Sequence, residues 1–175
     1  MSAPLVRPAT AADLEAVTAI YRHHVLHGLA SFELEPPDAN EIERRYTAIR
    51  ELGLPYFVAE LKGKVVGYAY AGVYRERPAY RYTVENSVYV DSECTGHGIG
   101  SALMPVLIDA CAAAGRRQII AVIGDSANHA SIKLHERFGF ARIGTLPAVG
   151  YKFGRWVDSV LMQKEIGEGS HAPPA

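Results

Sequence analysis

Hydrophobic residues near the N-terminus recur at the spacing of helices. A possible short strand over residues 5–7 precedes two predicted helices, over residues 10–28 and 38–53. In the first helix, Leu14 and Val17 begin a series of apolar residues three or four positions apart, which places them on one helix face. A glycine ends each pattern, as is typical of helix C-termini. We therefore expect the chain to begin with two helices that each bury one face.

Three β-forming segments follow. Residues 56–61 and 64–74 lie on either side of Lys62-Gly63, a pair of residues that is typical of a hairpin turn. Residues 82–90 are rich in Tyr, Thr and Val and predict a third long strand. Together these segments predict a three-stranded meander.

Helices and strands alternate over the rest of the chain. A helix that ends at Gly115 precedes residues 118–123, which are almost all apolar and predict a buried strand. Residues 128–140 predict a short helix that Gly139 ends, and residues 143–149 and 156–163 predict two closing strands. This order of elements predicts an α/β (α+β) domain around one central mixed sheet.

The composition agrees with a single soluble domain. The chain has 175 residues, of which 49% are hydrophobic and 21% charged, and this length suffices for one sizeable core. We assign residues 1–166 to the domain and expect residues 167–175 (GEGSHAPPA) to form a disordered tail. The N-terminus lacks the apolar segment of a signal peptide, and no apolar run approaches the roughly 18 residues that a membrane span needs.

Charge and cysteine content argue against several classes of protein. The 18 basic and 19 acidic residues balance one another, so we expect no general nucleic-acid-binding surface. Cys94 and Cys111 lack CxxC spacing, so we expect neither a disulfide framework nor a metal site. Two free thiols suit a reducing compartment, and we expect a cytoplasmic protein.

The segment VYVDSECTGHGIGSALM carries the strongest chemical signal. Gly96, Gly98 and Gly100 separate a predicted strand from a predicted helix, and Ser101 follows them. Free backbone N–H groups and the helix dipole attract phosphate to such a helix start, and glycines let the backbone approach the ligand. The segment therefore indicates a phosphate-binding loop. The alternative is a turn whose glycines serve packing alone.

Two common phosphate-binding loops differ from this segment. The G-x-x-x-x-G-K-[ST] pattern of a P-loop is absent. A Rossmann turn has G-x-G-x-x-G, whereas here Ser101 takes the sixth position and the turn follows a meander instead of a first strand. A dinucleotide-binding domain is thus the residual alternative.

The same segment resembles the acyl-CoA-binding motif of the GNAT superfamily of N-acetyltransferases. That motif has Gln or Arg, two residues, Gly, one residue, and then Gly or Ala; here Thr95 takes the first position before Gly98 and Gly100. The departure removes a side chain and leaves the backbone amides in place. A second motif of the family is matched by Asn128, Ser131, Leu134 and the sequence RFGF.

Four blocks are similar to one branch of that family, the phosphinothricin / methionine-sulfone N-acetyltransferases. They are SFELEPP, AGVYRERPAYRYTVENSVYV, VIGDSANHASIKLHERFGF and GYKFGRW. The resemblance implies a mixed, mostly antiparallel sheet of about six or seven strands with a splayed central pair, flanked by about four helices. It also implies a homodimer that transfers acetyl from acetyl-CoA, without a metal, to the α-amine of a small amino acid or analogue. Phosphinothricin, methionine sulfone and methionine sulfoximine are substrates of this type.

The resemblance also implies which residues bind acetyl-CoA. In the family, the strand before the glycines splays from its neighbour, its backbone pairs with the pantetheine arm, and backbone donors lie near the thioester carbonyl. Asn128 either binds the pantetheine or caps its helix. The implied acetyl-CoA-binding residues are Val88, Tyr89, Val90, Gly96, His97, Gly98, Ile99, Gly100, Ser101, Asn128 and Ser131.

Glu85 is the candidate general base. Alternation along its strand places Glu85 on one face with Ser87 and Tyr89, and places Asn86 on the other face with Val88. A carboxylate in a central strand costs free energy unless it is hydrogen-bonded or functional. An amine attacks a thioester only after it loses a proton, and Glu85 would accept that proton through a water molecule. The resemblance implies the same role, and the alternative is a solvated strand face.

His135 is the second catalytic candidate. It lies seven residues after Asn128, on the same helix face. Many members of the family carry a tyrosine near this position as the acid that protonates the leaving thiolate, and a histidine here is similar to the phosphinothricin branch. The alternative is a histidine on a helix surface.

Two arginines are candidates to bind the acidic groups of the substrate. Arg75 and Arg77 suit this role because a guanidinium binds oxyanions through paired N–H donors. Glu33 is a candidate for the ammonium group, and the alternative for each of these side chains is a solvated surface position. Together with residues that resemble the branch's pocket, the candidate substrate-binding set is Phe32, Glu33, Arg75, Arg77, Tyr80, Glu85 and Ser87.

Two other functions compete with the amino-acid acetyltransferase. A protein or peptide N-acetyltransferase would need an open groove, usually acidic for lysine-rich targets, and the paired arginines argue against one. A non-catalytic acyl-CoA sensor would need neither Glu85 nor His135, and the presence of both favours catalysis.

Overall fold

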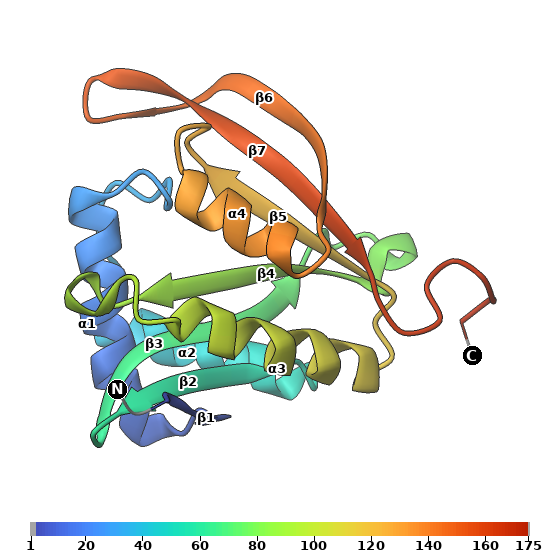
Figure 1. Ribbon diagram of the computed structural model, residues 1–175, viewed down its shortest axis with the longest axis horizontal. Coiled ribbons are helices and arrows are strands. Elements are labelled where there is room, and N and C mark those ends of the chain that lie inside the picture. The colour runs from blue at the N-terminus through green and yellow to red at the C-terminus, as the bar shows by residue number, and fades with distance from the viewer. Residues whose placement is uncertain (1–2, 175) are drawn as a thin grey trace.

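The computed structural model describes residues 3–174, and these residues form one mixed sheet with helices on both faces (Figure 1). In this range the sheet has seven strands: β1 (Leu5–Pro8), β2 (Tyr56–Leu61), β3 (Lys64–Val73), β4 (Thr83–Val90), β5 (Gln118–Gly124), β6 (Ala141–Lys152) and β7 (Arg155–Glu165). The α-helices of the same range are α1 (Leu14–His27), α2 (Ala39–Glu51), α3 (Ile99–Ala113) and α4 (His129–Arg137). Short 3₁₀ helices cover Ala11–Asp13, Pro78–Tyr80 and Ser92–Cys94.

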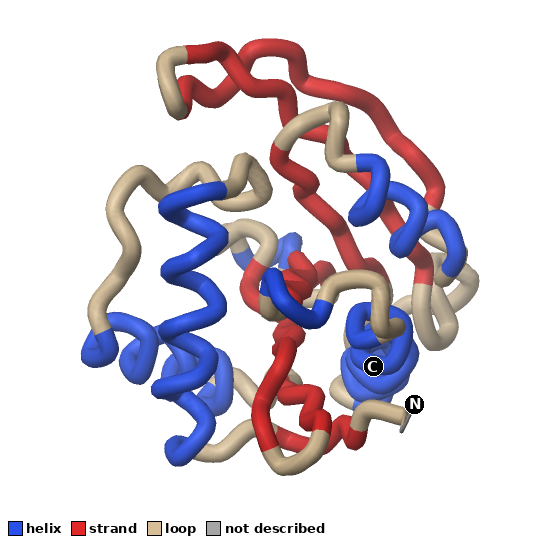
Figure 2. The backbone as a smooth tube through the Cα atoms, turned by 60° about the vertical axis from the view of Figure 1, so that its left-hand side comes forward, coloured by secondary structure: helices blue, strands red, loops and turns tan. Residues whose placement is uncertain are grey.

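Helices α1 and α2 cover one face of the sheet, and α3 and α4 cover the other. Figure 2 shows the long helix α1 on one side of the strands and α3 on the opposite side. On the first face Val17 of α1 packs in one apolar cluster with Tyr68 of β3. On the second face Leu103 of α3 packs in another with Ile119 of β5. This arrangement confirms the predicted α/β domain around a central mixed sheet.

The sheet opens between its two central strands. The strand order is β1-β2-β3-β4-β5-β7-β6, and β4–β5 is the only parallel pair among the described strands. Its register runs from Thr83 opposite Gln118 to Asn86 opposite Ala121, and no further within residues 3–174. Strand β5 nevertheless stays paired with β7 as far as Gly124. Strands β4 and β5 therefore diverge beyond Asn86 (Figure 1), which confirms the splayed central pair. We call this opening the fork.

The observed elements differ from the predicted ones mainly near the C-terminus. Strands β6 and β7 extend beyond the predicted 143–149 and 156–163 and form one long hairpin. Helix α4 ends at Arg137, just before Gly139, the predicted stop. Gly139 has a left-handed φ of 82° that ends the helical path. Phe140 then turns into the core, where it is buried.

The β6–β7 hairpin extends beyond the helices (Figure 1) and exposes several large apolar side chains. We call these side chains the hairpin surface: Ile143, Leu146, Val149, Tyr151, Phe153 and Trp156. An uncovered group of this size on a β-hairpin is typical of a surface that contacts another protein.

Residues 167–174 lie close to the end of α3, and the first four of them form a turn. The Glu168 carboxylate pairs with Arg117 at 2.8 Å, and the Ser170 hydroxyl donates to Glu165 at 2.9 Å. The disorder expected for this tail stays a prediction, and Ala175 lies outside the described residues. Among the described helices, none is both long and apolar enough to span a membrane.

Candidate active site

Two cavities meet at the fork. The large cavity has a volume of about 560 Å³ and is also lined by residues of α1 and of the segment that follows it. The small cavity has a volume of about 50 Å³ and is also lined by residues at the start of α4 and within it. Both cavities share five lining residues: Ala30, Ser87, Tyr89, Val122 and Gly124. A molecule in the fork can therefore contact side chains from both faces of the sheet.

Glu85 lines the large cavity from β4, with Ser87 and Tyr89, as the alternation along the strand predicted. Burial raises the pKa of its carboxyl above the ordinary value. Within residues 3–174 this carboxylate has no hydrogen-bond or ion-pair partner. A carboxylate in this state is suited to accept a proton from a group brought into the cavity.

Glu33 lines the same cavity but is already paired. Its Oε1 atom lies 2.5 Å from Nη1 of Arg45, and the Tyr21 hydroxyl donates to it at 3.1 Å. The charge of Glu33 is thus balanced within the chain, whereas that of Glu85 is not. The predicted contact of Glu33 with a substrate ammonium group stays a prediction.

The segment after α1 closes the large cavity. Phe32 and Ser31 line it. The buried Lys152 of β6 donates from Nζ to the Ser31 carbonyl at 2.7 Å, and the Tyr21 hydroxyl lies 2.9 Å from the Ser31 hydroxyl. These bonds fix the segment between α1 and the β6–β7 hairpin and place Phe32 at the cavity, while its contact with a substrate stays a prediction.

His135 lies on the other side of the fork and lines the small cavity. It is buried, with 4% of its surface exposed, so it is not a surface histidine. Its Nδ1 atom lies 2.8 Å from the Ser131 carbonyl oxygen and its Nε2 atom 2.9 Å from Nδ2 of Asn86. Burial lowers the pKa of the imidazole, which favours the neutral ring.

Asn128 and Ser131 also line the small cavity. Asn128 is the N-cap of α4, and its side-chain oxygen accepts the Ser131 N–H at 3.2 Å. The capping role is therefore present, while a contact with pantetheine stays a prediction.

The glycines before α3 have two different functions. Gly96 and Gly98 have φ angles of 77° and 76°, which L-residues with a side chain rarely adopt. Gly100 is helical, and a Cβ atom on it would lie 2.9 Å from Cδ2 of Leu134. Two glycines therefore form the turn, and the third permits close packing of α3 against α4.

This turn leaves backbone donors free at the start of α3. The Ala102 N–H is bonded to the Gly98 carbonyl at 2.9 Å. In the described chain, the N–H groups of Ile99, Gly100 and Ser101 have no backbone acceptor before the helix. Free donors beside open space suit an anionic group, as the sequence predicted.

The end of β4 presents backbone groups to the fork. The Asp91 N–H donates to the carbonyl of Val66 in β3 at 2.9 Å. Because successive residues of a strand point their backbone groups to opposite sides, those of Val88 and Val90 point away from β3. The Val90 carbonyl is already bonded to Nε2 of His24 at 2.8 Å. The groups of Val88 thus remain available for the predicted pairing with a ligand.

Arg75, Arg77 and Tyr80 lie elsewhere. They line a separate pocket of about 200 Å³ beyond β3, and none of the three lines the cavity that Glu85 lines in the described chain. The Arg75 guanidinium lies 5.6 Å from the centre of the Tyr80 ring, and both arginines are exposed. The structure therefore does not bring the predicted arginine clamp together with the candidate base.

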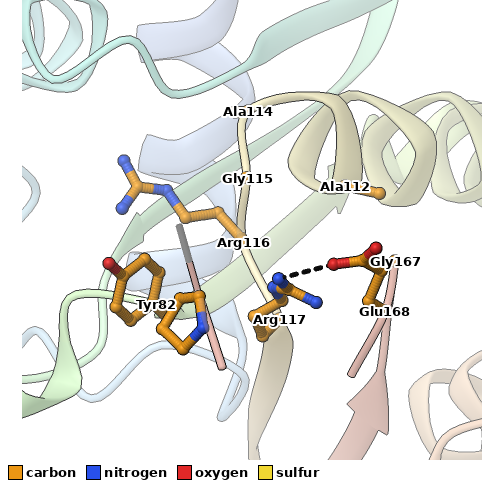
Figure 3. Close-up of a pocket in the computed structure, with 9 residues that line it drawn as sticks. Tyr82, Ala112, Ala114, Gly115, Arg116, Arg117, Gly167 and Glu168 are labelled. Atoms are coloured by element: carbon orange, nitrogen blue, oxygen red, sulfur yellow. Dashed lines mark ion pairs between the residues drawn. The ribbon is translucent and has the colours of Figure 1, made fainter. Parts of the chain in front are cut away.

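A further cavity lies at the far end of α3 (Figure 3). It has a volume of about 380 Å³ and is lined by Tyr82, Arg116, Arg117 and tail residues that include Glu168. Figure 3 shows the ion pair between Arg117 and Glu168 across it. It includes none of the predicted site residues, and α3 separates it from the glycine turn, so we place the candidate site at the fork.

Sequence reasoning assigned no role to three residues that the structure brings to the fork. Tyr21 and Tyr70 line the large cavity, and Asn86 joins His135. A polar residue at a buried position of a central strand is the signal that could have identified Asn86. The tyrosines offered no such signal, because aromatic residues are common in strands.

Comparisons with known proteins identify relatives of the whole chain. A model of the acetyltransferase (GNAT) family matches residues 18–140. The chain is 51% identical to phosphinothricin N-acetyltransferase of Alcaligenes faecalis, over 93% of this chain and 82% of the relative. It is 42% identical to L-methionine sulfoximine/L-methionine sulfone acetyltransferase of Salmonella typhimurium, over 97% of each chain. A GNAT superfamily phosphinothricin acetyltransferase from Sinorhizobium meliloti, solved with acetyl-CoA, superposes with a TM-score of 0.96 at 45% identity, covering 99% of this chain and 94% of that one.

Proposed function

The chain belongs to the acetyltransferase (GNAT) family, and from that premise we propose that it transfers acetyl from acetyl-CoA to the α-amine of a small amino acid or analogue. Substrates of the phosphinothricin, methionine sulfone or methionine sulfoximine type fit best, since the relatives that carry those names match nearly the whole chain. The observation that carries the proposal is the fork, where Glu85 and His135 approach one gap from opposite faces of the sheet.

The residues at the fork and at the start of α3 suit acetyl-CoA. The free N–H groups after Gly98 would hold its diphosphate, with Gly96 and His97 in the same exposed turn. The free backbone groups of Val88 would pair with the pantetheine arm, near Asn128 and Ser131. When bound, acetyl-CoA supplies the thioester carbon that the amine attacks. No metal is part of the proposal, and in the described chain no cluster of side chains could hold one.

Glu85 acts as the general base in this proposal. At neutral pH a substrate amine is an ammonium ion, and it must lose a proton before it attacks. The unpaired carboxylate of Glu85, with its raised pKa, accepts that proton directly or through a water molecule in the large cavity. Ser87 and Phe32 line the same cavity and contact the substrate.

His135 acts on the leaving group. It lies on the α4 side of the fork, where the sulfur would lie, and it supplies a proton to the departing thiolate. Arg75, Arg77 and Tyr80 lie in the loop between β3 and β4 and face another pocket. They would contact the substrate only if this loop turned them toward Glu85.

We also propose that the enzyme is a homodimer in the cytoplasm that acts on small molecules. The hairpin surface supports the dimer, because it exposes large apolar side chains such as Phe153 and Trp156. Cys94 and Cys111 are both free, which suits a reducing compartment. The balanced charge gives no reason to expect a nucleic-acid partner.

A panel of amines tests the proposed function. The purified protein is mixed with acetyl-CoA and one amine at a time, and free thiol is measured. We expect release with methionine sulfone, methionine sulfoximine or phosphinothricin, and much less with a peptide bearing a free N-terminus. Thermal shift with acetyl-CoA and with NAD is recorded in parallel. A shift with acetyl-CoA but no thiol release from any amine would identify a sensor, and release only with peptides would identify a peptide acetyltransferase.

A further inference from the structure

Asn86 makes buried contacts that the proposed function does not use. It is the last residue of β4 that pairs with β5 before the fork, and only 6% of its surface is exposed. Its Nδ2 atom lies 2.9 Å from Nε2 of His135. Its Oδ1 atom is buried and has no hydrogen-bond partner within residues 3–174. An unpartnered buried amide oxygen costs free energy, so its retention at the fork calls for an explanation.

The neighbours of His135 determine where its proton lies. A backbone carbonyl can only accept, so Nδ1, at 2.8 Å from the Ser131 oxygen, must carry a hydrogen. In the neutral ring Nε2 then has a lone pair and needs a donor, which the amide N–H of Asn86 supplies. The pair therefore holds a neutral imidazole with its proton on Nδ1.

The rest of the environment of His135 is uncharged. The Phe140 ring lies edge-on at 4.9 Å between ring centres, and the sulfur of Met104 on α3 lies 3.9 Å from Nδ2 of Asn86. Of the titratable groups nearby on β4, Glu85 faces the large cavity on the opposite side of the sheet. Within the described chain, no charged group therefore stabilises a protonated His135, and the side chain of Asn86 is the adjustable partner of Nε2.

We propose that Asn86 is a positioning residue that serves both protonation states of His135. While the ring is neutral, Nδ2 donates to Nε2. When Nε2 gains a proton, the amide turns over and the otherwise unpartnered Oδ1 accepts the new N–H. The proposal deepens the proposed function, on which it rests. Solvent first protonates Nε2. When the C–S bond breaks, its electron pair stays on sulfur, the Nε2 proton moves to that sulfur, and the ring is again neutral with its proton on Nδ1.

Imidazole ¹⁵N NMR of the whole protein tests the proposal without relying on activity. In the unmodified protein at pH 8 we expect His135 to carry its proton on Nδ1. In Asn86→Asp a carboxylate, which can only accept, faces Nε2, so the titration midpoint of His135 should rise by about one pH unit or more. Asn86→Ala should raise it less, because it removes the donor to the neutral ring without adding a charge. Asn40→Asp makes the same substitution at an exposed position of α2 and should leave the midpoint unchanged.

Two results would overturn the proposal. One is a proton on Nε2 in the unmodified protein, which needs no variant to fold. The other is an Asn86→Asp variant that melts cooperatively yet leaves the midpoint of His135 where it was. If the amine panel shows turnover, the alkaline limb of kcat should move upward in Asn86→Asp while KM for the amine stays the same. If the panel shows no turnover, the NMR result still decides the role of Asn86, so the two failures can be told apart.

Discussion

The carboxylate of Glu85 lies in the large cavity without a partner in the described chain, and burial raises its pKa. A raised carboxyl pKa means that the folded protein binds this proton more tightly than the unfolded chain does. The stability of the fold therefore falls as the pH rises from the ordinary glutamate pKa through the raised one. At neutral pH the ionised group destabilises the fold, which is typical of a residue retained for chemistry.

Glu85→Gln should therefore stabilise the protein. We expect a higher Tm than that of the unmodified protein at pH 8, where glutamine removes a buried charge. The difference should shrink as the pH falls below about 4, where the carboxyl is protonated in both states. Scanning calorimetry across this range measures it, with Glu35→Gln in the exposed segment after α1 as the matched control. A Tm difference that is independent of pH would contradict the unpaired carboxylate.

The same substitution should remove catalysis. We expect Glu85→Gln to lower kcat about 100-fold or more, because a general base contributes about 10²- to 10⁴-fold. The acid limb of kcat/KM in the unmodified enzyme should lie above the ordinary glutamate pKa, in the direction of the cited shift. Free-thiol release gives the rate, and calorimetric titration gives the affinity for acetyl-CoA, which should change little. An equal loss of rate and of affinity would rule out the role as a base.

At the scale of elements, the turn before α3 joins a strand end to a helix start that has free N–H groups. Gly98 is its left-handed residue, and its surroundings are open, so an added methyl group meets no atom within 4 Å. A substitution there consequently tests backbone conformation without steric overlap.

Gly98→Ala should lower stability by about 1 kcal/mol, the usual cost of a left-handed residue with a Cβ, and should also weaken binding of acetyl-CoA. Gly63→Ala is the matched control, because Gly63 has a φ of 77° and equally open surroundings in the β2–β3 turn. Urea denaturation should show a similar cost for both variants, while calorimetric titration should show weaker binding for Gly98→Ala alone. Equal affinities of the two variants for acetyl-CoA would show that the turn is not part of the cofactor site.

Helices and strands were predictable from the sequence where a periodic pattern of apolar residues ended at a glycine. Helix α1 and the β2–β3 hairpin were of this kind, with Gly28 and Gly63 at their ends. The predicted strand for β6 ended before Gly150, and pairing with β7 carries the observed strand past that glycine to Lys152. Long-range pairing thus overrode the local signal.

The candidate site was predictable only where a local pattern set the direction of a side chain. Strand alternation was enough to separate Glu85 from Asn86, because the side-chain period of a strand is two. The bond between Asn86 and His135 joins residues 49 positions apart, and no local pattern reports such a contact. Arg75 and Arg77 follow the end of β3, in a loop where no periodicity sets the direction of a side chain. Their predicted contact with the substrate therefore rested on residue type and on the resemblance, not on geometry, and it stays a prediction.

At the scale of the whole molecule, helices cover only part of the sheet. Helices α1 and α2 pack over the strands from β2 to β4, whereas the hairpin surface on β6 and β7 stays uncovered. Trp156 is 67% exposed in that surface and stacks edge-to-face on Tyr151 at 5.1 Å between ring centres. Two copies that paired through this surface would remove these rings from water, and the released water would favour the dimer.

If the proposed dimer forms through this surface, Trp156→Glu should turn it into a monomer. A charged side chain in an apolar contact loses its water and gains no partner, so association should weaken by orders of magnitude. The fold itself should stay intact, because Trp156 is exposed in it. Sedimentation velocity gives the mass, and calorimetry checks the fold. Leu5→Glu makes a similar change at the opposite edge of the sheet, where Leu5 is 61% exposed on β1, and should remain dimeric. If the unmodified protein sediments as a monomer, or if both variants stay dimeric, the hairpin surface is not the interface.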